Sequence, residues 1–429
     1  MSPKFRMPES KQLGQELQPH IVYNPISTDV PFLPHGTPIG IPKTVLVGQK
    51  IVGAKPPPIP MPGANAKRAI NYYADYGGCG FWRMIWPELL LNANMSAVIS
   101  GLTTMVLDPR FYERGVEAVR LQRQATPVQL SFANFLKAGS EKLKFKIIYE
   151  IDDIIFKDDI PDFNRCKVAF ENEEILRSSI SIMQLSDEIS VTCEYMKQYY
   201  MTHTGNKNIT VIPNYAPKLW ADGHYNVDNI SMRFNKYKRK PRVGYCGSGT
   251  HVDVTNRTNQ SDDFTHITKH IIKTRKDYQW VMMGCYPLPL KPFIDSGEIE
   301  FAGWAPFLNY PKAMDKLNLN ATIAPLMDCH FNRAKSNIKY LESAYQGLPG
   351  VYQDIVTYKD APLRFTTGDD MLDQLNKLLK DESYYMSISK KSREYSETMW
   401  LDDHLDEYLE LYFTSYGAPI RKALLKNNK

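Results

Sequence analysis

The sequence has no apolar run that approaches the roughly 18 residues needed for a membrane-spanning helix. Its start, MSPKFRMPES, also contains no apolar signal core. Cysteines are few: the six stand at positions 79, 166, 193, 246, 285 and 329, with no CxxC pair among them. A disulfide framework is therefore not expected, and a reduced, cytoplasmic protein is the simplest interpretation.

Several motifs that signal particular chemistries are missing as well. There is no GxxxxGK[ST] loop, no GxSxG turn and no GxGxxG fingerprint, so the sequence offers no support for P-loop, α/β-hydrolase or dinucleotide-binding chemistry. His266 and His270 lie one helical turn apart, but neither a third ligand nor an acidic base accompanies them. We therefore predict no metal site.

The composition is that of an ordinary globular protein. Hydrophobic residues make up 43% of the 429 residues and charged residues 23%. A chain of this length is too long for one ordinary core, so we expect two domains with additional segments. The net charge of +5 permits an anionic partner without requiring one.

Proline is concentrated at the start of the chain. Residues 1–64 hold thirteen of the 29 prolines. Proline lacks the N–H group that regular ladders need, so this segment predicts an extended N-terminal arm.

From AINYYADYGGCGFWR (69–83) onward, strand-like runs alternate with helical patterns, which indicates βα units around mostly parallel sheets. In the first half these runs are SAVIS (96–100), TMVL (104–107), VEAVRLQ (116–122), FKIIYEI (145–151), EISVT (188–192) and ITVIP (209–213). After a polar linker near 216–242 they are VGYCGSGTH (243–251), YQWVMMG (278–284), EIEFAG (298–303), NATIAPL (320–326) and GVYQD (350–354). We predict an α/β protein with two doubly wound, Rossmann-like domains, at 65–220 and 221–400, and a closing helix with a basic tail at 401–429.

The stretch FNRAKSNIKYLESAYQGLPG (331–350) predicts a helix that Gly347 ends, with an apolar stripe on one face. Its polar residues recur at the same spacing, and the first of them is Lys335. A lysine at a helix start is unfavourable unless an anion such as phosphate binds there. Glu342, about two turns further on, could then accept hydrogen bonds from a ribose. The alternative is an ordinary surface ion pair between Lys339 and Glu342.

Three further strand ends carry candidate functional residues. The glycine-rich turn in DYGGCGFWR (75–83) allows the backbone to approach a ligand, although a bare glycine turn is common. In YEIDDIIF (149–156), Asp152 and Asp153 could serve as bases, bind metal or steer an acceptor, or could simply be solvated. In GYCGSGTH (244–251), His251 is either a catalyst or an ordinary loop residue.

The order and spacing of these segments resemble the glycosyltransferases of the GT-B fold, close to the large retaining family four. The resemblance covers roughly residues 69–415. It rests on GGCGFWR with Pro87, VRLQRQ (119–124), YEIDDIIF, DEISVTCEYM (187–196), VIPNYAP (211–217), VGYCGSGTH and PLMDCHFNRAKSNIKYLESAYQGLPGV. It implies two Rossmann-like domains that face a central cleft, with a nucleotide-diphosphate sugar held by the C-terminal domain.

The resemblance also implies roles for individual residues. Glu342 corresponds to the glutamate on the ribose, and Lys335 with Ser336 to the diphosphate site. The family has a second glutamate eight positions before the first, but this chain has Ala334 there. The sugar-proximal candidates are therefore Asp328, His330, Phe331 and Asn332. The remaining implied positions are Gly78 and Gly80 near the diphosphate, Gly247 and Ser248 across the cleft, and Asp152 or Asp153 facing the acceptor.

The implied reaction is displacement at the anomeric carbon, with UDP or a similar nucleotide leaving and no metal required. For the acceptor, the basic run KYKRKPR (236–242) and the tail RKALLKNNK (421–429) suit a polyanion, unless these charges are only solvated. The arm and compact sequence are similar to phage-encoded enzymes that add a sugar such as glucose or arabinose to 5-hydroxymethylcytosine in DNA, in the host cytoplasm. The alternatives are transfer to a saccharide or cell-surface polymer, and a nucleotide-sugar-binding protein or epimerase.

Overall fold

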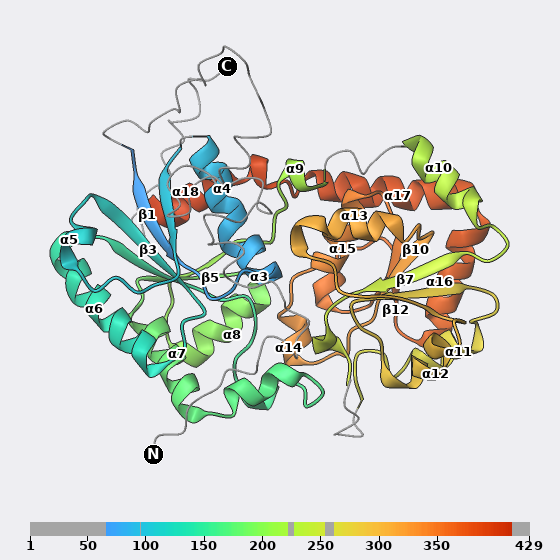
Figure 1. Ribbon diagram of the computed structural model, residues 1–429, viewed down its shortest axis with the longest axis horizontal. Helices are drawn as coiled ribbons and strands as arrows, with labels where there is room; N and C mark the ends of the chain where they lie inside the picture. The colour runs from blue at the N-terminus through green and yellow to red at the C-terminus, as the bar shows by residue number, and fades with distance from the viewer. Residues whose placement is uncertain (1–65, 95, 222–226, 254–260, 414–429) are drawn as a thin grey trace, which may run out of the picture.

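The computed structural model describes residues 66–94, 96–221, 227–253 and 261–413. The predicted arm (1–64) and the tail RKALLKNNK lie outside these ranges. The described chain forms two six-stranded sheets, one in each half of the molecule, with helices packed around both (Figure 1). In the described part of the chain, no helix has both the length and the apolar character needed to cross a bilayer.

The first sheet has the strand order β2-β1-β3-β4-β5-β6, and every paired strand runs parallel. Its strands are β1 (Arg68–Tyr72), β2 (Val98–Leu102), β3 (Val116–Gln122), β4 (Lys146–Glu150), β5 (Glu188–Val191) and β6 (Ile209–Val211). The longer helices around it are α4 (Trp86–Ala93), α6 (Pro127–Leu143), α7 (Glu173–Leu185) and α8 (Glu194–Thr204). Short helical segments lie at α3 (Gly78–Gly80), η2 (Phe81–Ile85), α5 (Pro109–Tyr112), η3 (Lys157–Asp159) and η4 (Arg165–Phe170).

The second sheet has the order β12-β11-β10-β7-β8-β9 and is also parallel throughout. Its strands are β7 (Arg242–Cys246), β8 (Gln279–Met283), β9 (Glu300–Ala302), β10 (Ala321–Ala324), β11 (Gly350–Gln353) and β12 (Arg364–Phe365). Its helices include α11 (Thr268–Lys273), α12 (Lys291–Asp295), α13 (Tyr310–Lys316), α14 (His330–Arg333), α15 (Ile338–Tyr345), α16 (Gly368–Lys380) and α17 (Glu382–Glu397). Short 3-10 turns are η5 (Gly249–His251), η6 (Leu288–Leu290), η7 (Phe307–Asn309), η8 (Val356–Tyr358) and η9 (Leu401–Asp403).

The α/β class and the two-sheet architecture predicted from the sequence are confirmed, and most strands lie where their apolar runs do. The TMVL prediction (104–107) is wrong: these residues form an irregular connection between β2 and α5. The expected linker at 216–242 contains two helices, α9 (Lys218–Ala221) and α10 (Val227–Lys236). The domain boundaries at 65–220 and 221–400 stay predictions.

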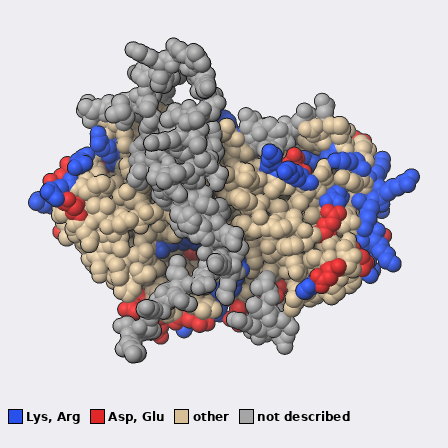
Figure 2. Space-filling view, in the orientation of Figure 1, with Lys and Arg blue, Asp and Glu red and all other residues tan. Residues whose placement is uncertain are grey.

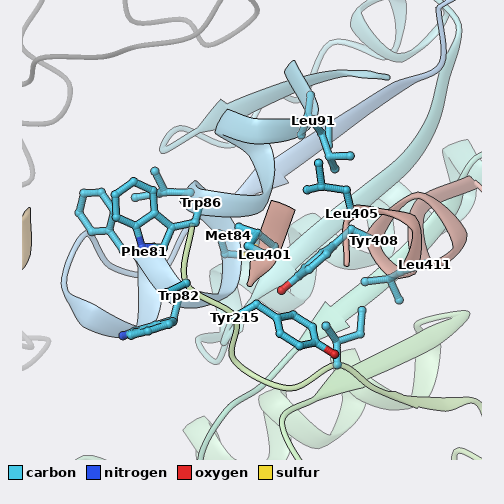
Figure 3. Close-up of a cluster of buried hydrophobic side chains, with 14 of the residues drawn as sticks. Phe81, Trp82, Met84, Trp86, Leu91, Tyr215, Leu401, Leu405, Tyr408 and Leu411 are labelled. Atoms are coloured by element: carbon cyan, nitrogen blue, oxygen red, sulfur yellow. The ribbon is translucent and has the colours of Figure 1, made fainter. Parts of the chain in front are cut away.

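The end of the described chain returns to the first sheet. Helix α18 (Leu405–Phe413) packs against β3 and α4. Leu405, Tyr408 and Leu411 of this helix lie in one buried cluster with Met84 and Leu91 (Figure 3). Helix α18 therefore packs on the first sheet, although it follows the second sheet in the sequence.

The first core also buries three charged side chains from three of the sequence motifs. Glu150 accepts from Arg83 Nε at 2.6 Å and forms a second ion pair with Arg120. All three side chains have no exposed surface. Arg83 also donates to the backbone oxygen of Ile212 at 2.6 Å and to Asn214 Oδ1 at 3.0 Å. The charges in GFWR, VRLQ and YEID thus join four segments of the first half of the molecule within its buried core.

Candidate active site

A cavity of about 760 Å³ lies between the two sheets, lined from both halves of the molecule. Its walls come from the segments that follow β1, β3 and β4 in the first sheet and β7, β8 and β10 in the second. In open α/β sheets, ligands bind beyond the carboxyl ends of the strands. The geometry therefore places the cavity where both sheets present their ligand-binding ends.

In the first half, the glycine turn after β1 is shaped by Asp75. Asp75 Oδ1 accepts from the backbone N–H groups of Gly77 at 2.8 Å and Gly80 at 3.1 Å. Its other oxygen forms an ion pair with Arg123, which follows β3 and has a left-handed backbone (φ 45°). Arg123 Nε also lies 3.5 Å from Asp152 Oδ1. These contacts join the glycine turn to the segments after β3 and β4, and Asp75, Arg123 and Asp152 all line the cavity.

Asp153 connects the two halves of the molecule across the cavity. Its Oδ1 lies 3.1 Å from Lys335 Nζ, which comes from the segment between α14 and α15. Burial raises the pKa of the Asp153 carboxyl, and only part of this effect is offset by Lys335. Burial alone would lower the pKa of Lys335, but Asp153 outweighs it and the pKa is raised. Lys335 is therefore charged in the cavity.

Glu342 on α15 lines the cavity and is held by Tyr310 of α13, whose hydroxyl donates to Glu342 Oε2 at 2.9 Å. Burial raises the pKa of Glu342 to about 7, against the opposing effects of Lys339 and Tyr310. Lys339 Nζ donates to the Cys246 backbone oxygen at 3.0 Å and lies 4.8 Å from the centre of the Tyr245 ring. The alternative of a surface Lys339–Glu342 ion pair is therefore wrong: both side chains face the cavity and have other partners.

His251 reaches the cavity from the turn after β7. Its Nδ1 lies 2.7 Å from Oδ2 of Asp263, which is completely buried. The other oxygen of Asp263 accepts from the Met327 backbone N–H and from Asn332 Nδ2, both at 2.8 Å. Burial lowers the pKa of His251 well below its usual value and raises the pKa of Asp263 to about 7. Asp263 thus holds the imidazole ring through Nδ1, and Nε2 lies on the opposite edge of the ring.

A further cation enters from the first half. Arg165, at the start of η4, lines the cavity, and its Nε is buried with no hydrogen-bond partner among the described residues. Its guanidinium lies against Gly249, where an added Cβ would come within 3.4 Å of Cζ. Arg165, Lys335 and Lys339 together make the cavity suited to an anion.

Aromatic side chains form the opposite rim of the cavity. Phe301 and Trp304, after β8 and around β9, line it and are each 44% exposed. Trp304 packs close to Gly284, whose φ of +85° and proximity to the Gly247 backbone leave no room for a side chain. Flat apolar surfaces of this kind stack well on planar ring systems.

The predicted site residues divide into two groups. The structure brings nine of them together around the cavity: Gly78, Asp152, Asp153, Gly247, Ser248, His251, Lys335, Ser336 and Glu342. Five do not line it: Gly80, Asp328, His330, Phe331 and Asn332. The functional roles of both groups stay predictions.

Each residue of the second group has another function in the structure. Asp328 pairs with Arg333 at 2.6 Å on the surface, and His330 bonds to the Tyr195 hydroxyl. Phe331 is buried with Val119, Leu136 and Ile147 of the first half, a group that we name the first core cluster, and Asn332 donates a hydrogen bond to Asp263. Gly80 is closed in by the Asp75 backbone, so its lack of a side chain serves the turn.

The predicted long helix at 331–350 is two helices, α14 and α15, separated by residues 334–337. Lys335 therefore stands in the break between helices, not in the first turn of the longer one. Ala334 is fully buried, and its backbone oxygen accepts a hydrogen bond from Cys193 Sγ at 3.3 Å. Cys193 belongs to the first half of the molecule. The position that holds a second glutamate in the enzymes that the sequence resembles is thus packed against the first half of the molecule.

Sequence reasoning missed Arg165, Asp263 and Tyr310. Arg165 stands alone in PDFNRCKV, and Tyr310 follows an ordinary loop, so neither carries a local signal. Asp263 lies in SDDF, and only its partner His251 was singled out. Among the described residues, no group of three His, Cys, Asp or Glu side chains could hold a metal ion.

Comparison with known proteins supports the architecture. HepE from Anabaena in complex with UDP-glucose has a TM-score of 0.52, with 9% identity over 80% of this chain and 99% of that one. HepE in complex with UDP gives 0.51, with 8% identity over 81% and 100%. At these identities the likeness shows a shared fold, the two-domain GT-B architecture. Models of protein families and curated protein sequences give no match to the chain.

Proposed function

We propose that the protein is a glycosyltransferase that moves a sugar from a UDP-sugar to a hydroxyl acceptor. The observation that carries the proposal is the cavity between the two sheets, where a carboxylate, Glu342, stands one helical turn from the cation Lys339. A nucleoside diphosphate presents the complementary pair, ribose hydroxyls and a negatively charged diphosphate. The HepE complexes with UDP and UDP-glucose share this fold, which supports the choice of nucleotide.

In this proposal the donor lies along the second half of the cavity. Phe301 and Trp304 offer a stacking surface for the base, and Glu342 accepts hydrogen bonds from the ribose. The diphosphate is met by Lys335 and Lys339 and, from the other half, by Arg165. These three cations stabilise the charge that develops on the leaving diphosphate, so we propose that no metal is required.

The acceptor would approach from the first half, where Asp152 and Asp153 line the cavity. Burial would raise the pKa of Asp152, but Arg123, Cys79, Arg83 and Lys335 together outweigh it, and the pKa lies below its usual value. The pKa of Asp153 is raised instead. Because the two environments separate the two pKa values, Asp153 is the better candidate to take the acceptor's proton.

The basic run KYKRKPR does not lie near this cavity. It ends at Arg242, the first residue of β7, whereas the cavity begins at Cys246, the last residue of the strand. A five-residue strand spans about 16 Å. Basic side chains gather on this outer part of the second half, around α10 and α16 (Figure 2). This run therefore gives no support to a DNA acceptor at the cavity, and transfer to 5-hydroxymethylcytosine stays a prediction.

A transfer assay tests the proposal. The full-length protein is incubated with a panel of UDP-sugars, alone and with saccharides, with plain DNA or with DNA that contains 5-hydroxymethylcytosine. We expect UDP release that depends on one acceptor, together with a matching mass gain on it, and unchanged rates in EDTA. UDP release that no acceptor stimulates, or conversion of the donor to an epimer, would contradict the proposal.

A further inference from the structure

We infer that His251 and Asp263 act as a proton-sharing pair that keeps a hydrogen on His251 Nε2, and that Nε2–H donates a hydrogen bond to the diphosphate of the donor. The inference rests on the proposed function, and it assigns a positioning role to Asp263. The sequence singled out His251 alone, without a partner.

The hydrogen bonds of Asp263 divide between its two oxygens. Its Oδ1 accepts from the Met327 backbone N–H and from Asn332 Nδ2. Among the residues that the structure describes, the hydrogen-bond partner of Oδ2 is His251 Nδ1, at 2.7 Å. A bond of this length between a carboxyl and an imidazole contains one proton, on either the oxygen or the nitrogen. When the proton is on Asp263, Nδ1 is the acceptor, and the neutral imidazole carries its hydrogen on Nε2.

Burial favours this uncharged arrangement. Asp263 has no exposed side-chain surface and the His251 side chain is 9% exposed, so both charged forms lose hydration. Burial accordingly raises the pKa of Asp263 to about 7 and lowers that of His251. Among the described residues, the titratable and charged groups that act on the pair include Lys335, Lys339, Asp262, His266, Tyr245, Cys329 and Tyr358.

The position of His251 identifies its ligand. It ends the turn Gly249–His251, against which the guanidinium of Arg165 lies. Lys335 and Lys339 are close enough to lower its pKa. An anion bound among these cations would be stabilised by an N–H donor at Nε2. A nitrogen lone pair at the same place would repel it. A base at this point would also be weakened by its cationic neighbours. The geometry therefore favours a donor to the diphosphate over a base for the acceptor.

Substitution of Asp263 by asparagine distinguishes a hydrogen-bond donor at His251 Nε2 from a base at the same atom. Because Met327 N–H and Asn332 Nδ2 require an acceptor, the amide oxygen takes the place of Oδ1. The amide nitrogen then donates to His251 Nδ1, as protonated Asp263 does. Asp263→Asn therefore keeps Nε2–H, whereas Asp263→Ala releases the ring. A base at Nε2 would be lost in both variants, since the asparagine fixes the wrong tautomer.

Calorimetric titration with UDP is the direct measurement, at pH 6 to 9, on wild type, Asp263→Asn, Asp263→Ala, His251→Ala and His251→Gln. We expect the Kd of Asp263→Asn to stay within about threefold of wild type at pH 7, and that of Asp263→Ala and His251→Ala to rise about tenfold. His251→Gln, whose amide can supply a donor near Nε2, should recover part of the loss. Circular dichroism and thermal melts identify any variant that does not fold.

The pH dependence gives a readout that a purely structural role would not change. Above about pH 7, ionised Asp263 draws the proton to Nδ1 and Nε2 loses its hydrogen, so UDP should bind wild type more weakly. In Asp263→Asn this decline should be absent, and the ratio of the two Kd values cancels the titration of UDP itself. An Asp263→Asn variant as weak as Asp263→Ala, or with the wild-type pH dependence, overturns the inference. Failure of wild type to bind UDP at all would refute the proposed function instead.

Discussion

Glu150 is a single residue whose substitution should strongly reduce stability. It is completely buried between Arg83 and Arg120. Glu150→Gln would leave two buried guanidinium groups without a countercharge, and loss of one partner of a buried ion pair costs about 3–5 kcal/mol. We expect a loss of that size in the free energy of unfolding, measured by urea denaturation.

The matched control for this prediction is Glu173→Gln. Glu173 pairs with Arg177 at 3.9 Å on the surface, where both side chains are about three-quarters exposed. Exposed pairs contribute roughly 0.2–1 kcal/mol, so this variant should unfold close to wild type. Equal effects of the two substitutions would show that the buried triad does not stabilise the first unit.

Single residues of the site were predictable where their type is unusual for the position. Glu342 and Lys335 stood out because a polar stripe continued along a packed helix. The sugar-proximal candidates Phe331 and Asn332 were harder, because their surroundings come from β-strands and turns distant in sequence. Phe331 packs in the first core cluster and Asn332 bonds to Asp263. One sequence alone does not report such pairings.

At the scale of elements, helix α15 carries both Lys339 and Glu342, and its end depends on Gly347. This glycine has a φ of +62°, and its N–H bonds to the Ala344 oxygen at 2.9 Å. A side chain in this left-handed conformation costs roughly 1–2 kcal/mol. We expect Gly347→Ala to lower the free energy of unfolding by that amount, as read from chemical denaturation.

Gly139→Ala provides the opposite case. Gly139 lies inside helix α6, and an added Cβ would meet Phe145 at an ordinary contact distance of 3.7 Å. Alanine is favoured over glycine in a helix interior by roughly 0.8–1.0 kcal/mol, so this substitution should stabilise the protein. If Gly347→Ala does not destabilise the protein while Gly139→Ala stabilises it, the helix-ending role of Gly347 is wrong.

Strands were predictable as elements, since buried parallel strands read as short apolar runs. VEAVRLQ (116–122) matches β3 residue for residue. TMVL (104–107) is also a short, mostly apolar run. It lies between the end of β2 and Pro109, so no room remains for a separate strand. The break between α14 and α15 has no glycine or proline to signal it. It is held by contacts with the other half, such as the bond from Asn214 Nδ2 to Ser336 Oγ at 2.8 Å.

At the scale of the whole molecule, the cavity is defined by contacts that join its two halves. Lys335 pairs with Asp153, and Arg165 lies against Gly249. Beside the cavity, Phe307 of the second half stacks on Phe81 of the first, with 4.7 Å between ring centres. The sequence predicted two sheets facing a cleft, but the pairing of side chains across it depends on how the two halves dock. In the proposed function, donor and acceptor would therefore meet only when the two halves of the chain are docked together.

The most direct test of the central claim, that this cavity binds a nucleoside diphosphate through Glu342, is calorimetric titration with UDP. Wild type and Glu410→Ala, which changes an exposed glutamate on α18, should bind one UDP per chain with equal affinity. At pH 8, above the pKa of about 7 of Glu342, Glu342→Ala should bind at least about tenfold more weakly, because hydrogen bonds to a charged group contribute roughly 1.5–3 kcal/mol. Equal UDP affinity of Glu342→Ala and wild type would contradict the account.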